Sequence, residues 1–180
     1  IAWLGVSVVQ KIDKMTDEGI GMLERSGAVS DMLSQIVILN RSEFRAAADL
    51  KESVIQESLK TIEERIIVTN QSVTFLEKNT PAGTRESELL KAVLDQWRKY
   101  EAELPNTIQA LKEVSVLPPE ALEAKRSSML KEANTSRGIA LLLEQEMSEY
   151  KRYLTSEVTQ QGQIAGEMVS STTRNLWLAA

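Results

Sequence analysis

The stretch from Met15 to Leu50, MTDEGIGMLERSGAVSDMLSQIVILNRSEFRAAADL, decides the fold of this 180-residue chain. Apolar residues return along it at every seventh position, and a second set stands half a heptad away. The first set is Met15, Met22, Val29 and Ile36, and the second contains Leu33 and Ala47. Spacing of three and four residues predicts a long helix that packs into a helical bundle.

Two arginines, Arg41 and Arg45, stand near the end of this stretch. Because they are four residues apart, their guanidinium groups lie on one side of the helix, about 6 Å apart along its axis. A fixed pair of guanidinium groups beside an apolar seam indicates one of two structures. The helix is either held in its bundle by salt bridges, or it forms a wall that binds anions.

Composition favours an all-helical chain that is not an enzyme. Aromatic residues make up 4% of the chain, and no run of alternating β-branched residues occurs. The chain has no cysteine and no histidine, which excludes disulfides, thiolate nucleophiles, histidine bases and zinc sites with nitrogen or sulfur ligands. The formal net charge of −5 is not accompanied by a basic stripe, so nucleic acid is not expected as a partner. No cofactor is expected either.

Both ends of the chain are apolar and carry a tryptophan: residues 1–9 read IAWLGVSVV, and residues 175–180 read NLWLAA. Neither stretch reaches the roughly 20 residues that a membrane helix requires. Tryptophan is typical of the membrane interface. We expect residues 1–9 to end a first transmembrane helix and residues 173–180 to start a second, with a domain at 10–172 between them. The alternative is that both stretches are frayed or cut ends.

Turn residues divide the domain into four expected helices, with turns at 49–53, 79–84 and 116–119. The second helix carries a heptad series whose single polar member is Thr69. Pro105 is expected to bend or split the third helix. At 1.5 Å per residue, the first and fourth helices are roughly 60 to 80 Å long and the other two nearer 40 Å. These lengths predict an up-down-up-down four-helix bundle that stands on a membrane, with long first and fourth helices.

The chain resembles the periplasmic ligand-binding domain of bacterial methyl-accepting chemotaxis receptors of the four-helix-bundle type. The resemblance rests on the helix pattern, the relative helix lengths, the apolar ends and the pair Arg41 and Arg45. The resemblance covers essentially the whole chain. It implies a transmembrane receptor of the inner membrane whose sensing domain lies in the periplasm and forms a homodimer through the first and fourth helices. Receptors of this type that bind aspartate use three arginines on the first helix, whereas this chain has two there.

The resemblance also implies a small carboxylate ligand, with di- or tricarboxylates favoured, bound in the membrane-distal half. Ligand binding would shift the fourth helix and signal through the second membrane segment. Two alternatives stay open: the periplasmic bundle of a sensor kinase, and a helical module that binds a periplasmic protein. An enzyme fits poorly, because the sequence has no glycine-rich phosphate loop and no Glu-x-x-His pair.

Counting residues back from the membrane-distal turns, with straight helices assumed, places polar residues from several helices in the membrane-distal half. The residues expected to contact the ligand are Arg41, Arg45, Arg65, Thr69, Trp97, Arg98, Tyr100 and Thr135. Arginine would hold a carboxylate through paired hydrogen bonds, supported by Thr69 and Tyr100. An aromatic ligand would instead stack near Trp97 and Tyr100. The alternatives are a core role for Trp97 and solvated or salt-bridged arginines, with Arg45 pairing with Asp49.

Overall fold

The computed structural model describes the backbone of residues 2–114 and 116–178 and the side chains of residues 6–114, 116–118 and 121–174. Within these ranges the chain folds into four helices and no strand, which confirms the expectation of an all-helical protein. The helices are α1 (Ala2–Ala48), α2 (Glu52–Asn79), α3 (Arg85–Val114) and α4 (Pro119–Leu178). The tryptophan side chains of both ends lie outside the described residues. None of the described helices carries an apolar stretch long enough to cross a membrane.

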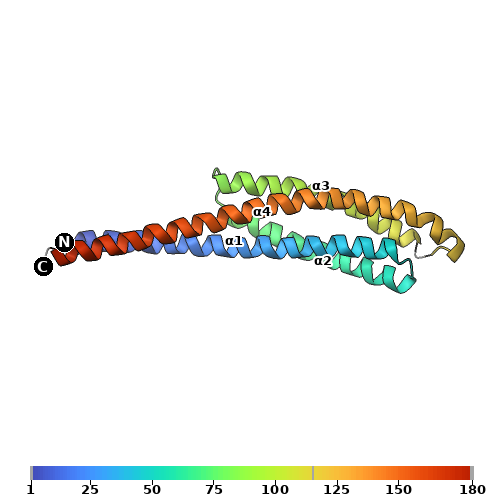
Figure 1. The fold of residues 1–180 in the computed structure, drawn as a ribbon, viewed down its shortest axis with the longest axis horizontal. Coiled ribbons are helices and arrows are strands. Elements are labelled where there is room, and N and C mark those ends of the chain that lie inside the picture. The colour runs from blue at the N-terminus through green and yellow to red at the C-terminus, as the bar shows by residue number, and fades with distance from the viewer. Residues whose placement is uncertain (1, 115, 179–180) are drawn as a thin grey trace.

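The helices α1 and α4 lie side by side, and the two chain ends meet at one end of the molecule (Figure 1). The helix α2 packs against α1, and α3 packs against α4, with a slighter contact between α2 and α3. The turn between α2 and α3 lies partway along the molecule (Figure 1). Beyond that turn, α1 and α4 continue as a pair.

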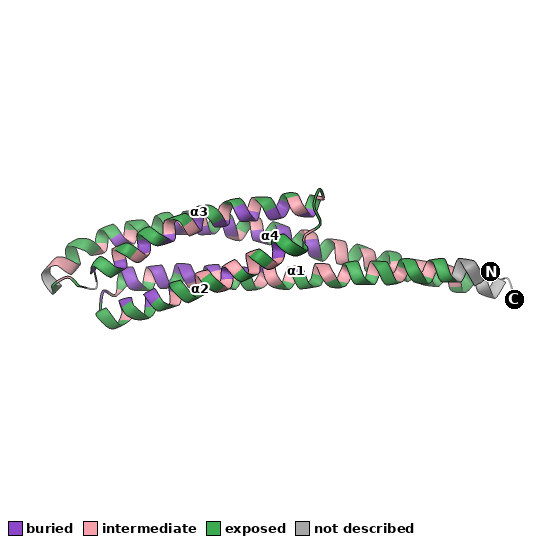
Figure 2. Cartoon of the chain, turned by 180° about the vertical axis from the view of Figure 1, so that it is seen from behind, coloured by how far each residue is buried: buried purple, intermediate pink, exposed green. Residues whose placement is uncertain are grey.

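We call this pair the stem and define it as residues 6–24 of α1 and 155–174 of α4. No residue of the stem so defined is buried, whereas the buried residues gather where four helices overlap (Figure 2). Of the heptad residues in α1, Val29 and Ile36 are therefore fully buried, but Met15 and Met22 are only half-buried. The protein thus has one core, and it occupies the part of the molecule away from the chain ends.

Pro105 lies inside α3, which is continuous from Arg85 to Val114, so of the two effects expected, a bend or a split, the split does not occur. Proline costs the helix one hydrogen bond because it has no N–H. Its ring is exposed, while its neighbours Leu104 and Thr107 are buried. Packing of the buried side holds α3 together across the missing bond.

The turn between α2 and α3 is built from residues with specific backbone roles. Gly83 has a φ of 71°, in the left-handed region that glycine adopts without strain. Thr84 then caps α3: its hydroxyl accepts a hydrogen bond from the Ser87 N–H at 3.2 Å, and the Ser87 hydroxyl accepts one from the Thr84 N–H at 3.1 Å. This reciprocal pair satisfies N–H groups that have no partner inside the helix.

We predict that Gly83→Ala lowers the free energy of unfolding by about 1 kcal/mol, because alanine is strained at a left-handed φ. A Cβ at this position would meet nothing within 4 Å, so the cost comes from the backbone alone. Gly27→Ala is the matched control, since its Cβ also has open space but lies inside α1. It should raise the free energy of unfolding by about 0.5–1 kcal/mol. Urea unfolding followed by circular dichroism measures both, and equal effects of the two substitutions would contradict the turn geometry.

Candidate functional site

A buried carboxylate, Glu43 of α1, lies at the centre of the four-helix part. It occupies the next position in the heptad series that runs through Val29 and Ile36, so the helix directs it into the core. Its side chain is 2% exposed. We define the Glu43 cluster as Asn40, Glu43, Tyr100, Thr107 and Ser136, which come from α1, α3 and α4.

All hydrogen bonds that Glu43 receives within this cluster come from neutral groups. The Tyr100 hydroxyl donates to Oε2 at 2.7 Å, and the Thr107 hydroxyl donates to Oε1 at 3.1 Å. The Asn40 amide donates to Oε2 at 3.4 Å, and the Ser136 hydroxyl is a further partner. Neutral donors therefore hold this buried carboxyl group, and no cation among the described residues is in hydrogen-bond contact with it.

Burial raises the pKa of Glu43, because desolvation disfavours the charged carboxylate. The hydrogen bonds from Tyr100, Ser136, Thr107 and Asn40 act in the opposite direction, and burial outweighs them. Burial also raises the pKa of Tyr100, with the charge of Glu43 adding to the effect. Tyr100 thus keeps its proton and acts as a donor, while Glu43 is the group of this pair that can take up a proton.

A second buried polar cluster lies where the four-helix part meets the stem. We define the Arg25–Glu86 cluster as Arg25 of α1, Thr80 after α2, Glu86 of α3 and Tyr150 of α4. The guanidinium group holds both carboxylate oxygens of Glu86, through Nε to Oε1 and through Nη2 to Oε2 at 3.0 Å. The Tyr150 hydroxyl donates to Glu86 Oε1 at 2.9 Å. The Tyr150 hydroxyl has one proton, and this bond uses it. In the 3.1 Å contact between the Thr80 and Tyr150 hydroxyls, Thr80 is therefore the donor.

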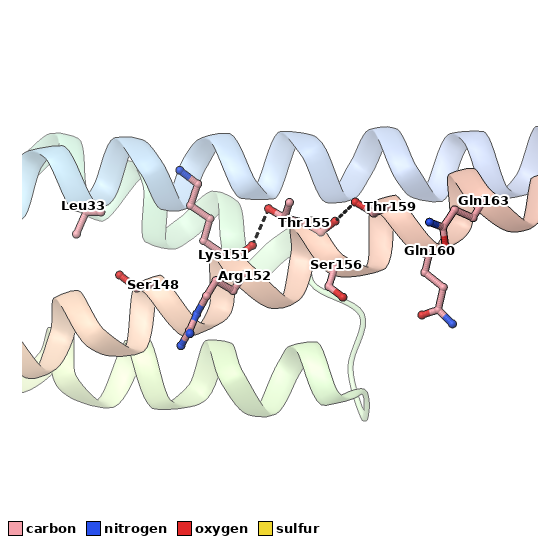
Figure 3. Close-up of a pocket in the computed structure, with 9 residues that line it drawn as sticks. All are labelled: Leu33, Ser148, Lys151, Arg152, Thr155, Ser156, Thr159, Gln160 and Gln163. Atoms are coloured by element: carbon pink, nitrogen blue, oxygen red, sulfur yellow. Dashed lines mark hydrogen bonds between the residues drawn. The ribbon is translucent and has the colours of Figure 1, made fainter.

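An open groove of about 930 Å³ lies along α4, beside Leu33 of α1. The hydroxyls of Thr155 and Thr159 donate to backbone carbonyls of their own helix at 3.0 and 2.9 Å (Figure 3). The two cations of the groove, Lys151 and Arg152, extend in opposite directions (Figure 3). Their charges therefore do not converge on one point, which makes the groove a poor cradle for a small anion.

The arginines predicted to bind a ligand lie mainly on the outside of the molecule. Arg41 is exposed and has no ion pair among the described residues. Arg45 is also exposed and pairs with Glu57 of α2 at 2.7 Å, in place of the partner one turn along its own helix. Arg98 is exposed and lies within 3.7 Å of an acid on α2 and 3.5 Å of an acid on α3. Arg41 and Arg45 therefore share the exposed side of α1, whereas Arg98 lies on a different helix, α3.

The other polar residues predicted from sequence divide between core and surface. Arg65 is half-buried and donates through Nη1 to Gln35 of α1 at 3.1 Å. Its Nε is buried without a hydrogen-bond partner among the described residues. Thr69 is fully buried, and its hydroxyl donates to the Arg65 carbonyl at 2.8 Å. Thr135 is exposed and donates to its own helix. The structure does not bring Thr135 to Thr69.

The two predicted aromatic residues are both core residues. Trp97 is 1% exposed, and its indole N–H donates to Asn70 of α2 at 3.0 Å. Its ring centroid lies 6.2 Å from that of Tyr100, at an angle of 58°. Of the eight predicted residues, Tyr100 alone belongs to the Glu43 cluster. Glu43 itself was missed, although a charged residue at a core heptad position is a signal that the sequence contains.

Comparison with known proteins adds no relative, because no family model, curated protein or solved structure matches the chain. Among the described residues, no group of three or more acidic side chains is placed to hold a metal ion. The site must therefore be interpreted from its own chemistry.

We predict that Glu43→Gln stabilises the protein at neutral pH. A carboxyl group whose pKa is raised by folding contributes stability below the unfolded pKa and loses it as the pH rises through the folded pKa. Glutamine keeps the shape and carries no charge, and the hydroxyl of Thr107 can turn to accept from its amide. The free energy of unfolding should exceed that of the parent by about 1.4 kcal/mol for each unit by which folding raises the pKa.

Urea unfolding at a series of pH values measures this difference. It should be near zero below about pH 4, grow as Glu43 ionises and then level off. Glu24→Gln removes an exposed carboxylate from the same helix and serves as the control. A difference between Glu43→Gln and the parent that does not change with pH would exclude a desolvated carboxylate at this position.

Proposed function

We propose that this protein is the extracytoplasmic sensing domain of a chemoreceptor, built as an up-down-up-down four-helix bundle with long first and fourth helices. The observation that carries the proposal is the stem: α1 and α4 run together to one end of the molecule, where both chain ends lie (Figure 1). This arrangement suits a domain whose two ends enter an inner membrane while the four-helix part extends into the periplasm.

Helix lengths support the same architecture. The helices α1 and α4 contain 47 and 60 residues, against 28 and 30 for α2 and α3. At 1.5 Å per residue, the outer pair is about 70 and 90 Å long, and the inner pair is about 42 and 45 Å. A movement of α4 at the four-helix part would therefore be carried to the chain end by a single continuous helix.

The exposed apolar residues of α1 support a homodimer through α1 and α4. They follow one stripe at spacings of three and four residues or their sums: Val6, Val9, Ile20, Leu23 and Val37. On α4, the residues of this kind are Leu141, Leu142, Ile164 and Val169. A two-helix stem without a buried residue is poorly stabilised alone. Packing two copies through this face would give the stem four helices and bury both stripes.

Arg41 continues the exposed stripe of α1, four residues after Val37. Among the predicted ligand arginines that are exposed, Arg41 alone has no acidic partner among the described residues, so its guanidinium group is available to a carboxylate. Arg45 is four residues further along and shares its exposure, although Glu57 competes for it. We infer that a di- or tricarboxylate binds on this distal face of α1, with the second copy covering it.

We predict that a di- or tricarboxylate raises the melting temperature of the protein, and that Arg41→Ala weakens its binding at least tenfold. The loss of one charge-assisted contact of about 1.5–3 kcal/mol accounts for this factor. Isothermal titration calorimetry measures the dissociation constant. Arg85→Ala, which removes an exposed arginine of α3, should bind as the parent does. If no carboxylate binds, the proposal of a small-molecule sensor fails, and a module that binds a periplasmic protein replaces it.

We predict that Leu23→Glu dissociates the dimer, because it places a charge in the middle of the apolar stripe. Sedimentation velocity over a range of concentrations measures the association constant, which should fall at least tenfold. Ile67→Glu is the matched control, since Ile67 of α2 is 60% exposed and Leu23 is 58% exposed. A parent protein that stays monomeric at high concentration, or equal effects of the two substitutions, would contradict the dimer face.

A further inference from the structure

We propose that the Arg25–Glu86 cluster fixes the axial position of α4 relative to α1 at the point where the four-helix part becomes the stem. The inference concerns how the helices are held, so it goes beyond the proposed function and holds whether or not the domain binds a carboxylate. It makes the cluster the contact that must change if α4 moves along α1.

The cluster lies at the boundary that the inference requires. Arg25 is the first buried residue of α1 along the described chain, and Leu154 is the last buried residue of α4, one turn after Tyr150. Glu86 stands in the first turn of α3. The cluster therefore gathers side chains from α1, α3 and α4 in the last buried layer before the stem, and Thr80 adds the end of α2.

The geometry of the cluster is specific. Arg25 grips both oxygens of Glu86, so the ion pair defines an orientation as well as a distance. A Cβ at Gly21 would lie 3.1 Å from Arg25 Nη1, which shows that glycine one turn earlier leaves room for the guanidinium group. Glu86 is thereby fixed to α1 and offers a fixed acceptor to α4.

Tyr150 connects α4 to this acceptor. Its hydroxyl reaches Glu86 at 2.9 Å and receives the Thr80 hydroxyl at 3.1 Å. An axial movement of α4 by about 3 Å, the rise of two residues, would take the phenol out of hydrogen-bond reach of Glu86. All of these groups are buried or half-buried, so water does not readily replace a lost partner. The hydrogen bond from Tyr150 to Glu86 is therefore either formed or broken, and intermediate positions of α4 are disfavoured.

Contacts in the stem provide a weaker constraint, because the hydrogen bond from Gln161 of α4 to Glu18 of α1 is 3.5 Å long and exposed. A Cβ added at Gly162 or Gly166 would meet nothing within 4 Å, so no side chain of α1 packs closely against these positions. A Cβ at Gly19 would meet only the end of the flexible Gln161 side chain, at 3.7 Å. With no buried side chain to set the register of α1 against α4 in the stem, that register follows from the cluster above it.

The test measures distances in the stem with spin labels. Because the chain has no cysteine, Asp17→Cys and Gln160→Cys place one label on an exposed position of each stem helix. Dilution of labelled with unlabelled protein restricts the signal to one chain. The distribution of distances between the labels is measured by pulsed electron paramagnetic resonance. In the parent background we expect one narrow distribution.

Glu86→Gln removes the charge that holds Arg25, and we expect it to broaden or displace the stem distribution by at least the rise of one residue, about 1.5 Å. Glu88→Gln is the matched control: it lies two residues along α3 and breaks an exposed ion pair with Arg85. Its distribution should equal that of the parent. Equal distributions in Glu86→Gln and the parent would overturn the inference.

A second label pair, at Ser34→Cys and Gln56→Cys, places both labels on exposed positions, one on α1 and one on α2. Because α4 carries neither label, this pair should keep its distribution in Glu86→Gln. If both label pairs broaden alike, the cluster stabilises the whole bundle and does not set the position of α4, which also overturns the inference. If Glu86→Gln fails to fold, Tyr150→Phe decides the question, because it removes the bond to α4 and leaves the ion pair intact. It must then change the stem distribution and spare the second pair.

Discussion

Two carboxylates, Glu43 and Glu86, lie inside a mainly apolar core, and each receives hydrogen bonds from side chains of other helices. An unpaired buried carboxylate would cost more than the packing around it contributes. Different donors compensate the burial of the two carboxylates. Glu86 receives a guanidinium group and a phenol, whereas Glu43 receives neutral donors alone. The positions of α3 and α4 against α1 depend on these bonds.

This difference gives the two clusters different properties. An ion pair that is bidentate and almost wholly buried has a narrow geometry, so it suits a fixed connection between helices. A buried carboxylate among hydroxyls and an amide has a raised pKa, so it takes up a proton more readily than an exposed carboxylate does. The first cluster lies at the junction with the stem, and the second lies deep in the four-helix part. A signal generated in the distal half would have to pass the first cluster to reach the chain ends.

Sequence reasoning described the helical core better than the candidate site. The spacing of three and four residues identified Val29 and Ile36 as buried, and it placed Thr69 in the seam of α2, where it is fully buried. The same rule places Glu43 in the core, because it follows Ile36 by seven residues, but a charged side chain is rarely fully buried and composition favours the surface for it. Arg41 and Arg45 lie on one side of α1, as their spacing requires, and that side is exposed. The spacing of residues shows which of them share one side of a helix. It does not show whether that side packs against other helices or faces solvent.

The sequence by itself determined the four helices, the turn at 79–84 and most of the buried stripe on each helix, because these features follow from contacts between residues a few positions apart. Only the tertiary structure decided which polar residues meet. Arg25 and Glu86 are 61 residues apart, and Glu43 and Tyr100 are 57 apart. Their pairing depends on the relative height and rotation of separate helices. The periodicity within one helix does not determine its height or rotation relative to another helix. Both are determined when the apolar stripes of the four helices pack into one core.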